Sequence, residues 1–179
     1  MYQKEIVDLV KKRYPKFKIE KKSESTLMKI IHWALLVLSF RQMKRFMEYI
    51  TTIGYTVYVP DRWDVLGDRT RASILVHEAR HMYQKELYGT FRYTFGYLLW
   101  PLPVGFSNFR LDMEIDANAV QIWYEHEKFK FARFGGHFWS VVDALSGPDY
   151  LWPTFSREKV EEKLRKAINR QSRIWLDMK

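Results

Sequence analysis

Residues 77–81 read His-Glu-Ala-Arg-His, within a stretch of chain whose apolar residues recur at helical spacing. Two histidines at positions i and i+4 lie about 40° apart around an α-helix, so His77 and His81 can share one metal ion. Glu78 lies about 100° from His77 on the same helix, beside the ion rather than on it. That is where a general base for an activated water is needed. The pattern therefore requires a rigid helix here and a further ligand elsewhere in the chain.

Composition limits which residues can supply that ligand. The 179 residues are 47% hydrophobic and 17% aromatic, which is enough to bury a core, and we expect one domain over residues 1–179. The sequence contains no cysteine, so it forms neither disulfides nor thiolate metal sites. Any bound metal must be held by His, Asp or Glu.

Apolar periodicity predicts an α+β fold that is predominantly α. We expect a small sheet from strands at 17–21 and 55–59, with a break at 51–54. The motif helix is expected between an N-cap at Asp68 or Thr70 and a stop at Gly89, with Arg80 facing solvent. Other helices are predicted at 2–14, at 27 onward (largely buried), and at 40–50, 110–127, 134–145 and 157–175. Residues 90–109 are expected to form a long loop.

The third metal ligand is expected on the helix at 110–127. One extended form of the motif requires Gly and His at the positions occupied by Gln84 and Leu87, so the metzincin class is excluded. Glu114 is the preferred ligand, and Asn118, one turn later, is placed to accept a hydrogen bond from the outer nitrogen of a ligating histidine. The rival ligands that remain open are Asp112, Asp116, His126 and His137.

The set His77, Glu78, His81, Glu114 and Ala117 resembles the gluzincin metallopeptidases, most of all the compact branch with His-Glu-x-x-His followed by Glu-x-x-Ala-Asp. Asn118 stands where that family usually has Asp. The resemblance covers about residues 51–127. It implies a zincin-like core with a small sheet beside the motif helix and a second ligand-bearing helix; the N- and C-terminal helices are additions to that core.

What the resemblance implies for function is zinc-dependent hydrolysis of peptide bonds. Zn²⁺ would be held by His77, His81 and Glu114, with Glu78 as general base. Two histidines and a carboxylate also suit iron, but the Glu inside the histidine pair favours zinc hydrolysis. A group that stabilises the transition state is needed as well, and the candidates are His137, Tyr124, His126 and Tyr150.

The alternative hypothesis is a structural or binding component of a larger assembly that retains a zincin fold and metal site. The chain loosely resembles compact metallopeptidase-like proteins of phages, some carried in the particle. A net charge of +9 would suit contact with an anionic polymer, although no nucleic-acid motif supports a nucleic-acid-binding module. We expect no signal peptide and no transmembrane segment, hence a cytoplasmic or virion-associated protein.

Overall fold

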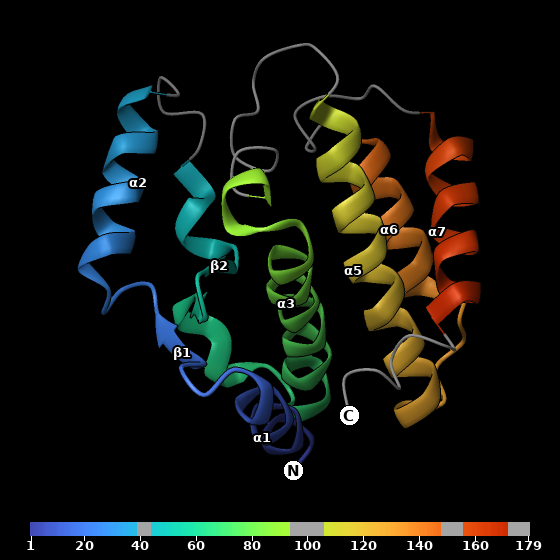
Figure 1. Ribbon diagram of the computed structural model, residues 1–179, viewed down its shortest axis with the longest axis horizontal. Helices are drawn as coiled ribbons and strands as arrows, with labels where there is room; N and C mark the ends of the chain where they lie inside the picture. Colours follow the sequence, from blue (N-terminus) through green and yellow to red (C-terminus); the bar gives the residue numbers. More distant parts are fainter. Residues whose placement is uncertain (39–43, 94–105, 148–155, 172–179) are drawn as a thin grey trace. The chain divides into compact units, whose positions relative to one another are not determined.

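The computed structural model describes residues 1–38, 44–93, 106–147 and 156–171 (Figure 1). These residues are mostly helical and include a three-stranded mixed sheet, which confirms the expected α+β, predominantly α class. The chain divides into two compact units, residues 1–72 and 73–179. The single domain over 1–179, and the placement of the sheet beside the motif helix that the resemblance implies, stay predictions.

The first unit contains the sheet. Strand β1 (Lys18–Lys21) pairs in parallel with β3 (Thr56–Val59), and β2 (Thr51–Ile53) pairs antiparallel with β3, giving the order β1-β3-β2. Gly54 has φ +65° and opens the tight turn between β2 and β3, a conformation that glycine adopts without strain. The expected break at 51–54 is therefore wrong: three of its residues form a strand, because the glycine reverses the chain into a hairpin.

The helices of this unit are α1 (Tyr2–Arg13) and α2 (Thr26–Leu38), with short 3₁₀ segments η1 (Lys44–Glu48) and η2 (Asp61–Val65). The expectation that α2 is largely buried is wrong, since Ile30 is 61% and Trp33 69% exposed. The described part of the helix expected at 40–50 is the 3₁₀ segment η1, and residues 40–43 lie outside the described structure.

Helix α3 (Asp68–Tyr88) carries the His-Glu-x-x-His motif and continues from the first unit into the second. The carboxylate of Asp68 accepts hydrogen bonds from the backbone N–H groups of Tyr2 (2.6 Å) and Gln3 (3.1 Å), so it caps α1 rather than α3. At the other end Gly89 has φ +78°, the left-handed conformation that stops a helix, as predicted.

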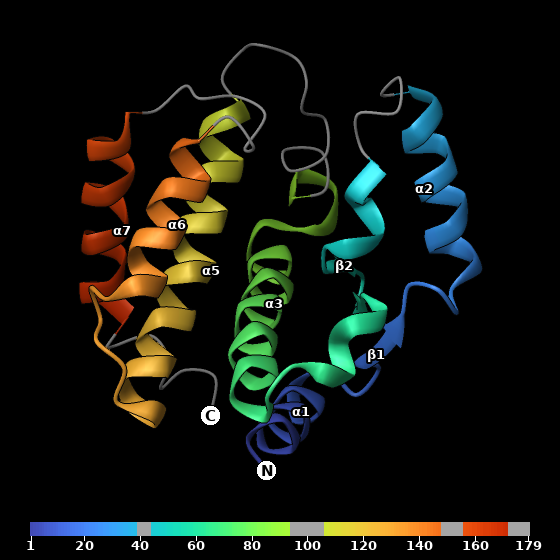
Figure 2. The ribbon, with the colours of Figure 1, turned by 180° about the vertical axis from the view of Figure 1, so that it is seen from behind.

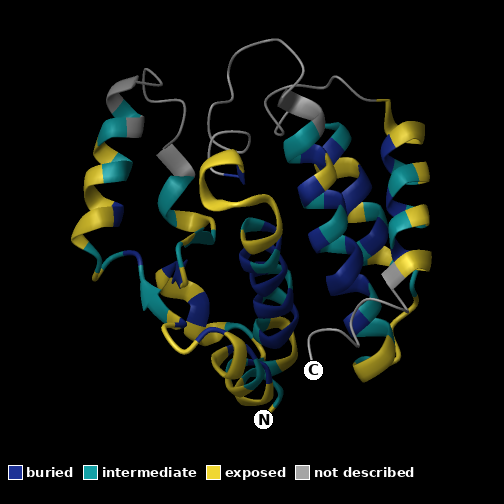
Figure 3. Ribbon diagram, in the orientation of Figure 1, coloured by how far each residue is buried: buried dark blue, intermediate teal, exposed yellow. Residues whose placement is uncertain are grey.

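Beyond α3 and a short helical segment at 90–93, the described part of the second unit contains a bundle of α5 (Phe106–Phe129), α6 (Gly136–Ser146) and α7 (Arg157–Gln171), which lie side by side in both views (Figures 1 and 2). Helix α7 buries one residue every four, Val160, Leu164 and Ile168, and its exposed residues alternate with these in Figure 3. The core is completed by apolar side chains of α5 and α6: Leu111, Ile115, Ala119, Ile122, Phe138, Val141, Val142 and Leu145.

A second row of buried residues on α5, among them Met113, Ala117 and Gln121, lies away from that core. Polar contacts join this side of α5 to α3. The Gln121 amide donates to Oγ of Ser73 at the start of α3 (2.9 Å), and the Gln84 amide near its end donates to the carbonyl of Met113 (2.9 Å). The two helices therefore run antiparallel, which brings the middle of α3 opposite the first half of α5.

None of the helices in the described ranges is both long and apolar enough to cross a membrane.

Candidate metal centre

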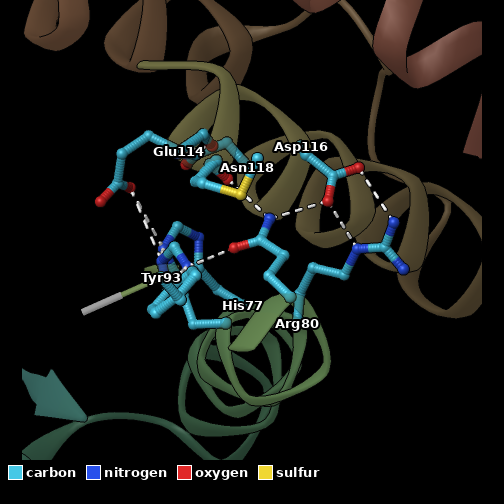
Figure 4. Close-up of polar contacts among 9 residues, drawn as sticks. His77, Arg80, Tyr93, Glu114, Asp116 and Asn118 are labelled. Carbon is cyan, nitrogen blue, oxygen red and sulfur yellow. Dashed lines mark hydrogen bonds and ion pairs between the residues drawn. The ribbon is translucent and has the colours of Figure 1, made fainter. Parts of the chain in front are cut away.

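His77 and His81 on α3 and Glu114 on α5 converge on one point. Their ligand atoms lie within 4.8 Å of one another. The two histidine Nε2 atoms are 3.0 Å apart, and Oε2 of Glu114 lies 3.5 Å from Nε2 of His77 and 3.8 Å from Nε2 of His81. Figure 4 shows Glu114 reaching from α5 toward His77 on α3. The structure thus brings together the three side chains that the sequence indicated as ligands.

The spacing of these three atoms can be compared with the spacing that zinc requires. Zinc binds histidine nitrogen and carboxylate oxygen at about 2.0–2.2 Å, which puts neighbouring ligand atoms of a tetrahedron about 3.4 Å apart. The observed separations of 3.0, 3.5 and 3.8 Å scatter around that value. A point equidistant from all three lies about 2.0 Å from each, within the range of zinc–ligand bonds. The donor set and its spacing therefore fit a zinc ion with one coordination position left over.

The outer nitrogen of His81 is held by two groups. Nδ1 of His81 lies 2.9 Å from Oε1 of Gln84, one turn further along α3, and 3.0 Å from the hydroxyl of Tyr93. The amide nitrogen of Gln84 donates to the carbonyl oxygen of Met113 (2.9 Å) and to Oδ2 of Asp116 (2.8 Å). His81 is thereby tied through Gln84 to the helix that supplies Glu114, and its ring orientation is fixed relative to that ligand.

Arg80, between the two histidines, is buried and does not face solvent as expected. Its Nε and Nη2 donate to the two carboxylate oxygens of Asp116 at 2.6 and 3.1 Å, a two-point ion pair that Figure 4 shows. The guanidinium also lies 4.9 Å from the ring centre of Tyr83. The expectation failed because Arg80 leaves α3 on the side that α5 covers.

His77 has charged and polar neighbours that raise its pKa. Burial alone lowers the pKa of this imidazole, but the contact with Glu114, the charge of Glu78 and the amide of Gln121 together raise it above its usual value. Nδ1 of His77 has no hydrogen bond of ordinary geometry within the described residues, so the approach of Gln121 is a loose one. A metal ion at Nε2 of His77 would compete with the proton that these neighbours favour.

Behind Gln121 a chain of hydrogen bonds leads away from the site. The hydroxyl of Ser73 accepts from Gln121 and donates to Glu125, and the other oxygen of Glu125 lies 2.7 Å from Nδ1 of His137 at the start of α6. Burial raises the pKa of Glu125, but the hydrogen bonds from His137 and Ser73 and the charge of His137 outweigh it, and the net pKa is lowered. The chain links α3, α5 and α6 at the end of α5 that is remote from Glu114.

Glu78 is buried beside the converging ligands. Its negative charge contributes to the raised pKa of His77 and also to that of Tyr93, where burial is the larger cause. Glu78 directly follows His77 on α3 and is not one of the three converging ligands. Its role as a general base stays a prediction.

The predicted role of Asn118 is not found. Its amide donates to the backbone carbonyl of Glu114 on its own helix (2.8 Å), and the outer nitrogen of His81 is taken by Gln84 instead. The physical reason is reach, because an asparagine side chain bonds readily to the carbonyl four residues earlier. The hydrogen bond of Asn118 is thus to the backbone of Glu114 and not to a histidine ring.

The rival ligands all have other contacts. Asp112 accepts from Lys163 (2.5 Å), Asp116 from Arg80, and His126 lies 2.8 Å from the carbonyl oxygen of Phe131. His137 is bound to Glu125. These residues do not join the cluster, which leaves Glu114 as its carboxylate.

The candidates for transition-state stabilisation do not gather at this site. Tyr124 is buried against Phe129 and lies ten residues beyond Glu114 on α5, about 15 Å along the axis. His137 contacts Glu125, at the same remote end of α5. Tyr150 lies outside the described residues. The three described candidates are thus held elsewhere: Tyr124 by packing, His137 by a carboxylate and His126 by the carbonyl oxygen of Phe131.

Three residues near the ligands were missed by reasoning from sequence, Gln84, Gln121 and Tyr93. The two glutamines carried a usable signal, since Gln84 is three residues after His81 and Gln121 is seven after Glu114, both on the ligand face of their helices. Tyr93 carried none, because it follows the helix stop at Gly89.

Comparison with known proteins adds no relative: no family model matches the chain, and neither does any curated protein or solved structure. The interpretation of the site therefore rests on its own geometry.

Proposed function

We propose that the chain is a zinc-dependent peptide-bond hydrolase of the gluzincin type, with His77, His81 and Glu114 as metal ligands. The observation that supports this most is the convergence of two Nε2 atoms and one carboxylate oxygen at separations of 3.0, 3.5 and 3.8 Å. The order of ligands along the chain, two on one helix and a Glu on a later one, agrees with the resemblance. Zinc would leave one coordination position for water or substrate.

The chemistry divides between the metal and one side chain. Bound zinc lowers the pKa of water and polarises the carbonyl of a scissile bond. Glu78 accepts the proton of the attacking water and passes it to the leaving nitrogen. Its burial beside the ligands supports this role, since a carboxylate in a water-poor site interacts more strongly with a nearby proton or cation than one in solvent.

Zinc is proposed rather than iron because of Glu78. Two histidines and a carboxylate also hold iron in oxygenases, but such sites need no general base within the histidine pair. Metal analysis of the purified protein separates the two, and iron at stoichiometric amounts would contradict the zinc proposal.

The proposed role of Glu78 is tested by Glu78→Gln, with Glu86→Gln as the matched control. Glu86 is two turns further along α3 and exposed, so its replacement changes the charge of the same helix by the same amount outside the site. We expect Glu78→Gln to retain zinc and to lose at least 100-fold in peptidase activity, the scale of a general base. Glu86→Gln should retain both.

Two results would contradict the proposal. Peptidase activity unchanged by Glu78→Gln would remove the general base. A wild-type protein that binds zinc but cleaves no member of a broad peptide library would favour the alternative, a component of a larger assembly that retains the metal site.

A further inference from the structure

The orientation of the Gln84 side chain is determined by its surroundings. One end of this amide faces the carbonyl oxygen of Met113 and a carboxylate oxygen of Asp116, both of which only accept hydrogen bonds. That end must be the NH₂ group, so the other end, which faces Nδ1 of His81 at 2.9 Å, is the carbonyl oxygen. An amide rotated by 180° would place oxygen against two acceptors and lose both hydrogen bonds.

We propose that Gln84 is a positioning residue that holds His81 as the Nδ1–H tautomer, with the lone pair of Nε2 directed at Glu114 and His77. A carbonyl oxygen can only accept, so the contact at 2.9 Å exists only if Nδ1 carries the proton. Neutral imidazole has one N–H, and Nε2 is then free of hydrogen and able to bind a metal. The consequence for metal binding rests on the proposed function; the tautomer itself does not.

Tyr93 and Gln84 both contact Nδ1 of His81, and they can favour opposite tautomers. The hydroxyl of Tyr93 lies 3.0 Å from the same Nδ1 and can either accept from it or donate to it. A tyrosine hydroxyl carries its proton at neutral pH and can therefore donate. A donated hydrogen bond from Tyr93 would require a bare Nδ1 and would move the proton of His81 to Nε2, the metal-facing atom. Gln84 prevents this, since its oxygen needs a proton on Nδ1.

Asp116 and Arg80 keep Gln84 in place. Asp116 accepts from Gln84 through Oδ2, the same oxygen that Nε of Arg80 contacts at 2.6 Å. The buried guanidinium of Arg80 donates to both carboxylate oxygens of Asp116, which positions the oxygen that accepts from Gln84. These contacts form a connected polar network in which each donor and acceptor can be assigned in one way only. Its members are Arg80, Asp116, Gln84 and His81.

The test is ¹⁵N NMR of the imidazole rings in the metal-free protein at a pH where His81 is neutral, because the ¹⁵N shifts of Nδ1 and Nε2 separate the two tautomers. The test variant is Gln84→Met, which keeps the volume and removes both hydrogen-bonding ends. Asn118→Leu is the matched control, since it removes an amide from the same helix pair that does not contact His81.

We expect the Nδ1–H tautomer in the wild type and in Asn118→Leu, and a shift to Nε2–H in Gln84→Met. Zinc affinity, measured by competition with a chromophoric chelator, should fall about 10- to 100-fold in Gln84→Met. An Nε2–H tautomer in the wild type would overturn the proposal without any variant. So would an unchanged tautomer in Gln84→Met.

The two proposals fail separately. A wild type that binds no zinc, but whose His81 changes tautomer in Gln84→Met, would leave the positioning role intact and contradict the proposed function. Tight zinc binding by the wild type, with the same tautomer and the same affinity in Gln84→Met, would contradict the positioning role alone.

Discussion

Replacing Arg80 tests whether α3 and α5 are joined as the structure describes. The side chain of Arg80 is 8% exposed. Arg80→Met keeps an apolar stem of similar length and removes the guanidinium. Breaking a buried ion pair costs about 3–5 kcal/mol, whereas an exposed pair contributes about 0–1 kcal/mol. Asp116 is 27% exposed, so water offsets part of the loss after its partner is removed. We therefore expect the free energy of unfolding to fall by about 2–3 kcal/mol.

The measurement is urea denaturation at neutral pH, followed by circular dichroism. Arg92→Met is the matched control, because Arg92 is exposed and its replacement should change stability by no more than about 0.5 kcal/mol. Asp116→Asn completes a double-mutant cycle, in which we expect a coupling energy above about 1 kcal/mol. A loss in Arg80→Met equal to that in Arg92→Met would show that Arg80 faces solvent and would refute the antiparallel contact of α3 with α5.

Three further predictions concern the second unit and the end of α3. Leu164→Ala should lower the free energy of unfolding by about 2–5 kcal/mol in denaturant titrations, because Leu164 is fully buried in the bundle core. Asn169→Ala, at an exposed position of the same helix, should leave it unchanged. Equal effects would place Leu164 outside the core. Gly89→Ala should lower the free energy of unfolding by about 1–2 kcal/mol, because φ is +78° while no atom obstructs the new methyl group. Gly67→Ala, at negative φ, should not destabilise the protein. A neutral Gly89→Ala would mean that α3 does not end there. Glu125 has a lowered pKa, so its stabilising effect is complete above its ordinary pKa of 4.5 and is lost as pH falls through the lower value of the folded protein. Stability should therefore decrease below pH 4.5 less steeply in Glu125→Gln than in the wild type. Identical pH profiles would contradict the contact of Glu125 with His137.

The features that were predicted correctly depend on short-range periodicity. The described part of the helix expected at 157–175 is α7, which buries Val160, Leu164 and Ile168 at four-residue spacing; residues 172–175 lie outside the described structure. The shared face of His77 and His81 follows from helix geometry alone. Glu114 could be predicted as the third ligand for two reasons. It lies on the next strongly helical segment, and a carboxylate was the ligand type that the two histidines still lacked.

The features that were missed depend on how two distant segments meet. Whether Arg80 is buried, and whether Gln84 or Asn118 reaches His81, is decided by the register of α3 against α5, which no local pattern encodes. Asn118 was the plausible choice because it lies one turn from Glu114, but its side chain bonds to its own helix. The exposure of Trp33 is a similar case, since its helix is apolar on most faces and only tertiary structure decides which residues are covered.

The proposed zinc site is tested most directly by a zinc titration of the purified, metal-free protein alongside His77→Ala, His81→Ala and Glu114→Ala. We predict one zinc ion per wild-type chain, and a strongly weakened affinity in each of the three variants, because each removes one of the three converging ligand atoms. Asp112→Ala, which removes a rival carboxylate of α5 from outside the cluster, should bind zinc as the wild type does. Wild-type chains that bind no zinc, or zinc binding that is unaffected by loss of His77, His81 or Glu114, would contradict the account.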